Sequence, residues 1–355
     1  MRRRVLAVRL RSLGDAVLTT PLLRVLRRGG CETGVVVERP FHAVFEGHPD
    51  VDVLFALPGR SPGARVGLLS ELRRFHADLA LDLHGGTTAA LLTRFSGAPT
   101  RVGFSSARWS RLYTVQVPDP VRVWGRGPLH TVEHQLTLLK YLDFPVLPIP
   151  PLVVPVDATE RIWADAWLKR NGISEGFVLV HPAAAFETKQ WPLDRFATLA
   201  VRLLKQGDQV VVTAGPGEEN LLTELERLVG NGVTILPPAP LRRFAAVAAR
   251  CGLYVGNDTG ATHLTAALGK DIVVIFGSSN PVAWRPWGVR YRLVRSTQPC
   301  IPCPGYRCLR FDSPRCIQDV PVEAVWNAIH ELRSGLPDGD DQVEVPTRPS
   351  MQEVP

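Results

Sequence analysis

The sequence lacks long apolar runs, and none approaches the roughly 18 consecutive apolar residues that a membrane-spanning helix needs. After the arginines at the N-terminus, the apolar run covers only Val5 to Val8 before Arg9 interrupts it. That run is too short for the core of a secretory signal peptide. We therefore expect the protein to act in the cytoplasm.

Several common site motifs are also missing. The sequence contains no GxGxxG fingerprint, no HExxH and no evident pair of catalytic carboxylates. Glycines at 85–86 and 215–217 follow apolar runs, but neither pair is completed by the lysine and hydroxyl residue of a P-loop. No nucleic-acid recognition motif is present. Phosphate binding, if the protein performs it, must therefore use another arrangement.

Acidic residues are scarce in the first half of the chain. Overall, 41 Lys and Arg against 34 Asp and Glu give a net charge of +7. Residues 1–150 hold 20 basic against 12 acidic residues, a net of +8, and the remainder carries −1. An anionic partner is therefore expected to bind the first half. Nucleic acid, anionic lipid and a phosphorylated or carboxylated substrate all fit, and solubility alone is the plain alternative.

Short apolar runs alternate with helical patterns along the chain. A helix is expected over 15–28, with a local irregularity at Pro21. Strand, turn and helix in repetition predict parallel sheets with crossover helices. The strands are expected at 5–10, 34–38, 51–57, 79–83, 177–181, 209–214, 233–236, 253–256 and 272–276.

A proline-rich segment divides the chain. Five prolines fall between Pro145 and Pro155, which favours a stiff, extended linker. We therefore expect domains over 1–150 and 151–337, followed by a disordered tail over 338–355. The last helix either stays with the second domain or packs back on the first. Open α/β folds bind ligands at the carboxyl ends of their strands, so a cleft between the domains is the expected site.

The segment GNDTGATHL, residues 256–264, gives the strongest local signal. Asp258 or Thr259 can cap the helix that follows, and Gly260 leaves room for a ligand at its first turn. Free amides and the positive end of the helix dipole favour phosphate. Thr259 and His263 lie four residues apart and share a helix face. The alternative is an ordinary N-cap with a packed histidine.

Two further segments carry charged residues next to predicted strands. In HPAAAFETKQWP, residues 181–192, Lys189 precedes a helix that Pro192 can open, and its ammonium could offset the charge of a diphosphate leaving group. In RLRSLGD, Gly14 permits a tight turn and Asp15 could serve as a general base toward a hydroxyl. A solvated lysine and a helix-capping aspartate are the plain alternatives.

Four blocks in this order resemble the lipopolysaccharide heptosyltransferases (ADP-heptose:LPS heptosyltransferase, glycosyltransferase family 9). The blocks are SLGDAVLTTPLLRVLR, DLHGGTTAALLTRFSG, HPAAAFETKQWP and GNDTGATHLTAALG, and the resemblance spans residues 4–333. It implies a GT-B fold, in which two Rossmann-like doubly wound domains face a central cleft. It also implies inverting, metal-independent transfer of heptose from ADP-heptose to the lipid A–Kdo inner core, with no cofactor required.

The resemblance implies roles for individual residues. Asp15 falls on the general base, Lys189 on a catalytic, donor-phosphate lysine, and Arg9 and Arg11 on the acceptor side. The acceptor-binding first domain would touch the membrane only peripherally, through the acceptor's lipid. Alanines at 183–185 replace the hydroxyl residues of some relatives, which leaves another nucleotide sugar open as donor. The donor-binding positions are Thr188, Lys189, Glu218, Ala239, Asp258, Thr259, Gly260 and His263.

Four clustered cysteines have two interpretations. Cys300, Cys303, Cys308 and Cys316 could form a structural zinc site, or they could remain free or redox-active thiols. Two other functions compete with glycosyl transfer. A nucleotide-sugar epimerase of similar shape would turn over the donor alone. A non-catalytic nucleic-acid binder ranks last because the basic excess is diffuse, and we expect no nucleic-acid partner.

Overall fold

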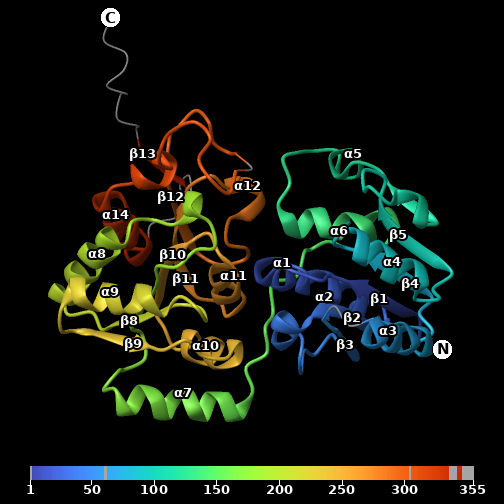
Figure 1. Ribbon diagram of the computed structural model, residues 1–355, viewed down its shortest axis with the longest axis horizontal. Coiled ribbons are helices and arrows are strands. Elements are labelled where there is room, and N and C mark those ends of the chain that lie inside the picture. The colour runs from blue at the N-terminus through green and yellow to red at the C-terminus, as the bar shows by residue number, and fades with distance from the viewer. Residues whose placement is uncertain (1, 60–61, 304, 336–341, 346–355) are drawn as a thin grey trace, which may run out of the picture. The chain divides into compact units, whose positions relative to one another are not determined.

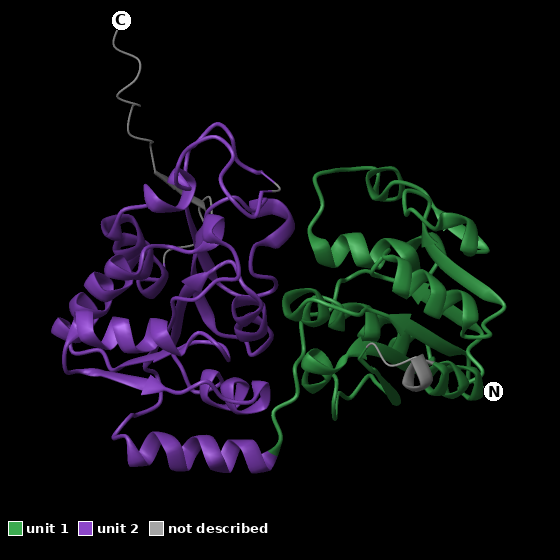
Figure 2. Cartoon of the chain, viewed as in Figure 1, with its two compact units in different colours: residues 1–157 green, residues 158–355 purple. Residues whose placement is uncertain are grey.

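The computed structural model describes residues 2–59, 62–303, 305–335 and 342–345. The chain divides into unit 1, Met1–Asp157, and unit 2, Ala158–Pro355 (Figure 2). The boundary expected after residue 150 lies inside unit 1. Part of the proline-rich segment packs on this unit, because Leu152 and Val154 are buried and the Val153 amide donates to Thr20 Oγ1 over 3.1 Å.

Unit 1 contains a six-stranded parallel sheet in the order β3-β2-β1-β4-β5-β6, which is the Rossmann order (Figure 1). Its strands are β1 (Arg4–Val8), β2 (Glu32–Glu38), β3 (Val53–Leu57), β4 (Leu79–Asp82), β5 (Thr100–Phe104) and β6 (Val115–Val117). Its helices are α1 (Leu13–Val17), α2 (Thr20–Arg28), α3 (Pro62–Arg74), α4 (Thr87–Phe95), α5 (Pro120–Trp124) and α6 (Thr131–Tyr141), with 3-10 turns η1 (Arg39–Val44) and η2 (Ser110–Leu112).

Unit 2 repeats this order with one further strand, β13-β12-β11-β10-β7-β8-β9, again parallel throughout. Its strands are β7 (Val178–His181), β8 (Val210–Thr213), β9 (Val233–Leu236), β10 (Leu253–Asn257), β11 (Asp271–Phe276), β12 (Tyr291–Ser296) and β13 (Gln342–Val345). Its helices are α7 (Ala158–Arg170), α8 (Leu193–Lys205), α9 (Glu219–Val229), α10 (Leu241–Ala248), α11 (Gly260–Ala267), α12 (Pro281–Trp284), α13 (Arg315–Gln318) and α14 (Val322–Arg333), with the 3-10 turn η3 (Glu187–Lys189).

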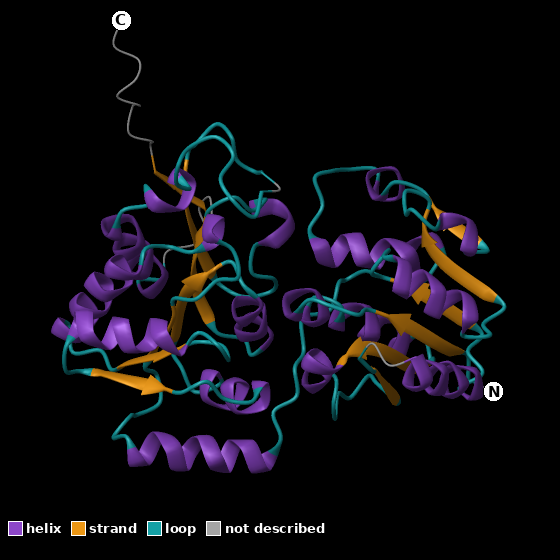
Figure 3. Cartoon of the chain, in the orientation of Figure 1, coloured by secondary structure: helices purple, strands orange, loops and turns teal. Residues whose placement is uncertain are grey.

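Helices cover both faces of each sheet (Figure 3). In unit 2, α8, α9 and α14 lie on one face, and α14 packs on β11, β12 and α8 of its own unit. Strands buried on both faces read as continuous apolar runs, which explains why the sequence pattern identifies them. No helix in the described ranges is both long and apolar enough to cross a bilayer. Alternate strand positions supply the core under these helices: Val178, Val180, Val210, Val212, Leu253, Val255, Val273 and Ile275.

The structure differs from the sequence predictions at several places. The helix expected over 15–28 is two helices, α1 and α2, and the second begins just before Pro21, whose missing N–H is tolerated in a first turn. Strands β5, β6 and β12 were not predicted. The tail expected to be disordered over 338–355 contains β13, and the rest of that tail lies outside the described residues.

Candidate active site

Each sheet has a point from which the strand order runs outward in both directions. It lies between β1 and β4 in unit 1 and between β7 and β10 in unit 2. Loops that leave the carboxyl ends there diverge, and ligands of this fold class bind in the resulting crevice. Arg9 and Asp15 follow β1, Asp82 ends β4, Lys189 follows β7 and Asp258 follows β10. The topology thus brings the sequence motifs to the expected ligand positions of the two units.

In unit 2, Lys189 and Asp258 form an ion pair. The Lys189 Nζ donates to Asp258 Oδ2 over 2.8 Å, and the Ser279 hydroxyl donates to the same oxygen. The Asp258 side chain is 4% exposed, whereas that of Lys189 is 26% exposed. The carboxylate is therefore buried and held by two donors, while the ammonium stays accessible. An anionic ligand can reach Lys189 without uncovering Asp258.

Asn257, the last residue of β10, anchors the segment that carries Lys189. Its side chain is fully buried. Its Oδ1 accepts from the Trp191 amide over 3.1 Å, and its Nδ2 donates to the Pro182 carbonyl over 2.8 Å. One amide therefore fixes both the start and the end of the loop. The sequence analysis assigned no role to Asn257, because its partners lie more than sixty residues away.

Helix α11 begins directly after Asp258. Thr259 is its N-cap residue in extended conformation, and its side chain makes no capping hydrogen bond. Thr259 therefore occupies the predicted N-cap position without a capping side-chain bond, while Asp258 is engaged by Lys189 and Ser279. The first-turn amides, beginning at Gly260, thus lack the side-chain acceptor that usually covers them. An anion is a suitable partner for such a helix start.

His263 lies one turn into α11 and is almost completely buried. Its Nε2 is 3.8 Å from Asp258 Oδ1. Burial lowers the pKa of His263; the Asp258 carboxylate opposes this effect and the Lys189 ammonium adds to it. The imidazole is therefore neutral near pH 7. It packs beside Asp258 and does not add positive charge to the site.

The other predicted donor residues occupy different surroundings. Thr188 is buried, and its hydroxyl donates to the Gly305 carbonyl over 2.9 Å. Glu218 Oε2 accepts from the Gly215 amide over 2.7 Å, which closes the loop after β8. Ala239 is half-buried between β9 and α10. Lys189 thus lies next to the start of α11, whereas Glu218 and Ala239 lie on the separate loops that follow β8 and β9.

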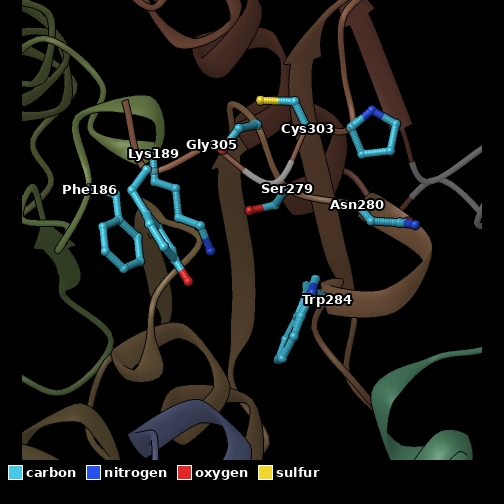
Figure 4. A pocket seen from close by; sticks show the side chains of 10 residues that line it. Phe186, Lys189, Ser279, Asn280, Trp284, Cys303 and Gly305 are labelled. Carbon is cyan, nitrogen blue, oxygen red and sulfur yellow. The ribbon is translucent and has the colours of Figure 1, made fainter. Parts of the chain in front are cut away.

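A cavity of about 370 Å³ opens beside Lys189 (Figure 4). Phe186 and Lys189 stand on one side of it, and Ser279, Asn280 and Trp284 stand on the other. Pro302, Cys303, Gly305 and Tyr306 also line it. The sequence analysis did not predict this cavity, because its walls come from three separate loops.

Gly277 allows the loop with Thr188 to approach the end of β11. A Cβ atom at Gly277 would collide with the Thr188 carbonyl oxygen. The Ser278 amide donates to that carbonyl over 3.1 Å. Only glycine therefore permits this close contact between the Thr188 loop and the end of β11.

In unit 1, the two carboxylate oxygens of Asp15 have different partners. Its Oδ2 accepts from the backbone amide and the hydroxyl of Ser12, over 3.2 and 3.0 Å, as a capping side chain would. Its Oδ1 pairs with the Arg9 guanidinium, which also donates to the Leu83 carbonyl. The Asp15 side chain remains 18% exposed. The capping role and a role toward a ligand are therefore compatible.

Asp82, at the end of the neighbouring strand β4, acts electrostatically on Arg9 and was not predicted from the sequence. Its Oδ1 accepts from the amides of His84 and Gly85, over 2.9 and 2.7 Å, and its Oδ2 accepts from the Tyr113 hydroxyl over 2.7 Å. Burial lowers the pKa of Arg9 to about 10, although Asp82 opposes the shift. Arg9 thus stays charged near pH 7 between two carboxylates.

The two arginines predicted to contact the acceptor differ in exposure. Arg9 is buried, whereas Arg11 is exposed. Burial lowers the pKa of the nearby His84, and the positive charges of Arg9 and Arg11 lower it further. Of the two arginines, Arg11 is the one whose side chain is open to solvent for an anionic ligand.

The four clustered cysteines are free thiols, as are Cys31 and Cys251. Burial and then the neighbouring thiols raise the pKa of Cys316 to about 12. Within the described ranges, no three His, Cys, Asp or Glu side chains are arranged to hold a metal ion. The cysteines form no disulfides with one another, and a zinc site and free or redox-active thiols both stay predictions from the cysteine spacing.

His181 ends β7 next to Phe244, with their ring centroids 6.3 Å apart, and burial lowers its pKa from 6.5 to about 4. In the unfolded chain His181 binds a proton below about pH 6.5, whereas in the folded protein it binds one only below about pH 4. The free energy of unfolding therefore falls as the pH decreases from 6.5 to 4. At pH 5, His181 should cost about 2 kcal/mol of unfolding free energy. Urea unfolding at pH 7 and pH 5 tests this. His181→Asn should lose less stability on acidification than the native protein, and an equal loss would contradict the assignment.

Comparison with known proteins identifies the family of the chain. The model of glycosyltransferase family 9 (heptosyltransferase) matches residues 65–311. Lipopolysaccharide heptosyltransferase 1 of Pseudomonas aeruginosa is 30% identical over 325 residues, which cover 86% of this chain and 87% of that protein.

Solved structures agree in fold. A family 9 glycosyltransferase from Veillonella parvula has a TM-score of 0.81 at 21% identity, covering 93% of this chain and 97% of that one. An Escherichia coli heptosyltransferase with ADP-2-deoxy-2-fluoro heptose has a TM-score of 0.68 at 22% identity, covering 92% and 99%. The expected fold class of two Rossmann-like α/β domains is confirmed. The chain therefore belongs to glycosyltransferase family 9, the heptosyltransferases, and is a glycosyltransferase.

Proposed function

We propose that the protein transfers heptose from ADP-heptose to an anionic, lipid-linked saccharide of the lipopolysaccharide inner core, with inversion and without a catalytic metal. The observation that carries the donor assignment is the accessible Lys189 ammonium beside the uncapped start of α11. Both groups favour a diphosphate. A relative of the same fold holds an ADP-heptose analogue, which supports ADP-heptose as the donor.

Charge develops on both the sugar and the diphosphate during the reaction, and the proposed residues accept the proton and stabilise the leaving group. The acceptor hydroxyl attacks the anomeric carbon while Asp15 takes its proton. The bond from the anomeric carbon to the diphosphate oxygen breaks, and the electron pair leaves with ADP. Positive charge grows on the sugar ring, as in glycoside hydrolysis. Negative charge grows on the diphosphate, where Lys189 and the dipole of α11 stabilise it in place of a metal.

The acceptor side of the proposal rests on charge. Residues 1–150 carry a net +8, and Arg11 is exposed at the carboxyl end of β1. An inner core bearing carboxylates and phosphates complements this surface. Membrane contact is then peripheral, through the lipid of the acceptor, and the protein works at the cytoplasmic face.

A panel of nucleotide sugars tests the donor. ADP-heptose should raise the melting temperature more than UDP- or GDP-sugars at equal concentration, because selective binding stabilises the native state. Product analysis with donor alone separates the alternatives, since an epimerase converts it without acceptor. A larger shift with another nucleotide sugar would move the proposal to that donor. No shift with any of them would overturn it.

A further inference from the structure

We propose that the cavity beside Lys189 binds the sugar of the donor. We further propose that Tyr306, in the cysteine-rich segment that runs from Cys300 to Cys316, is a specificity-determining residue for that sugar. The inference rests on the proposed function and assigns a part of the site that the family motifs leave open. Three observations carry it: the strand order, the chemistry of the lining and the contacts that fix the segment.

The strand order gives the donor a direction. Asp258 follows β10 and Lys189 follows β7, the two neighbouring strands at the centre of the sheet. Beyond β7 lie β8 and β9, whose loops carry Glu218 and Ala239, two of the predicted donor-binding positions, which we assign to the nucleoside. Beyond β10 lie β11 and β12, whose loops line the cavity. With the diphosphate at Lys189 and the nucleoside toward β8 and β9, the sugar is left on the side of β11 and β12.

The cavity lining suits a sugar ring. The rings of Phe186 and Tyr306 lie 4.3 Å apart between centroids at 35°, and Trp284 stands across from Phe186 (Figure 4). Ser279 and Asn280 add polar groups to the same wall. Sugars present an apolar face of C–H groups with hydroxyls at the rim, so aromatic walls with a few polar groups match their chemistry.

Tyr306 is placed by its neighbours on the cysteine-rich segment. The Gly305 carbonyl accepts from Thr188 Oγ1 over 2.9 Å, and the Cys303 amide donates to the Ser278 carbonyl over 2.9 Å. The Cys308 amide donates to Glu187 Oε1 over 3.1 Å. The bonds to Thr188 and Glu187 tie the segment to the loop that carries Lys189, and the bond to Ser278 ties it to the loop after β11.

The exposure of Tyr306 supports a role in binding. Tyr306 is itself 67% exposed, so the core does not require its ring. A large aromatic side chain held in a fixed place yet left open to solvent is available to a ligand.

Calorimetric titration of ADP and of ADP-heptose tests the assignment. Tyr306→Ala should weaken ADP-heptose binding about tenfold and change ADP binding less than about twofold, because the lost ring contacts the sugar alone. Tyr306→Phe should retain most of the affinity, since it keeps the ring. Leu309→Ala, in the same segment and 94% exposed, is the matched control and should leave both affinities unchanged.

Other outcomes separate this inference from the proposed function. Equal weakening of ADP and ADP-heptose would mean that Tyr306 supports the whole donor site and would overturn the sugar assignment. Unchanged ADP-heptose binding with a raised KM for the acceptor would assign the cavity to the acceptor instead. Failure of the native protein to bind either ligand would reject the proposed donor itself.

Discussion

Replacing Asp15 by Asn should lower kcat by about 10²–10⁴-fold, the usual contribution of a general base. The affinity for ADP-heptose should stay within about twofold, because donor binding is assigned to unit 2. Asparagine keeps a side-chain oxygen that can accept from Ser12, so the start of α1 is retained. The change therefore removes basicity and charge while it preserves shape. Single-turnover rates and calorimetric donor affinity measure the two effects separately.

A matched control for Asp15→Asn lies at the opposite edge of the same sheet, where β1 and β2 begin. Glu32 pairs with Arg4 over 3.1 Å at the start of β2 and β1, and both side chains are partly exposed. Like Asp15→Asn, Glu32→Gln neutralises the carboxylate of an arginine–carboxylate pair in unit 1, but this pair lies away from the carboxyl ends of the strands. Its kcat should equal that of the native protein. Native turnover by Asp15→Asn would remove Asp15 from the mechanism and leave it as a helix cap.

The sequence alone was sufficient for residues that act through local patterns. Each stands in a short segment directly after a buried strand, and the parallel strands of each sheet end at the same edge of that sheet; these residues are Lys189, Asp258 and Gly260 in unit 2 and Asp15 in unit 1. The strand pattern could therefore place them before any coordinates were known. The two Rossmann-like sheets followed from the same alternation.

Residues that act through distant partners could not be found in this way. Asp82 meets Tyr113 across 31 residues, and Asn257 meets Trp191 across 66. The stacking of Phe186 on Tyr306 joins loops that are far apart in the sequence. Such contacts depend on how loops fold over the sheet, and no local period records them.

Strand β12 shows the same limit for secondary structure. Its sequence, YRLVRS, has two arginines that interrupt a short apolar run, so it lacks the continuous apolar pattern of the other buried strands. In the structure Arg292 is buried and its Nε lies 3.5 Å from Glu331 Oε2 on α14. A buried arginine becomes acceptable when a neighbouring helix supplies a carboxylate, and only the tertiary fold provides it.

Replacing Lys189 by Ala should affect both donor binding and turnover. In the proposed complex the ammonium attracts the diphosphate in the ground state and attracts it more strongly as the leaving group gains charge, so kcat/KM should fall by about 10²–10³-fold. ADP affinity should fall as well, which distinguishes this variant from Asp15→Asn. Lys189→Arg keeps the charge and should recover part of both. Lys205→Ala, at the exposed last turn of α8, is the matched control and should behave as the native protein.

The change at Lys189 also tests the role of Asp258. In Lys189→Ala the buried Asp258 carboxylate loses the ammonium and keeps the second of its two donors, the Ser279 hydroxyl. Because a buried charge is then left without its ion-pair partner, the free energy of unfolding should be measurably lower than that of the native protein. Adding Asp258→Asn to Lys189→Ala should restore stability, because the uncompensated charge is gone, but it should not restore ADP binding. Urea unfolding and calorimetric titration on the two variants give these two readouts. Native ADP affinity in Lys189→Ala would show that the diphosphate is held elsewhere, and the assignment of the donor site would fail with it.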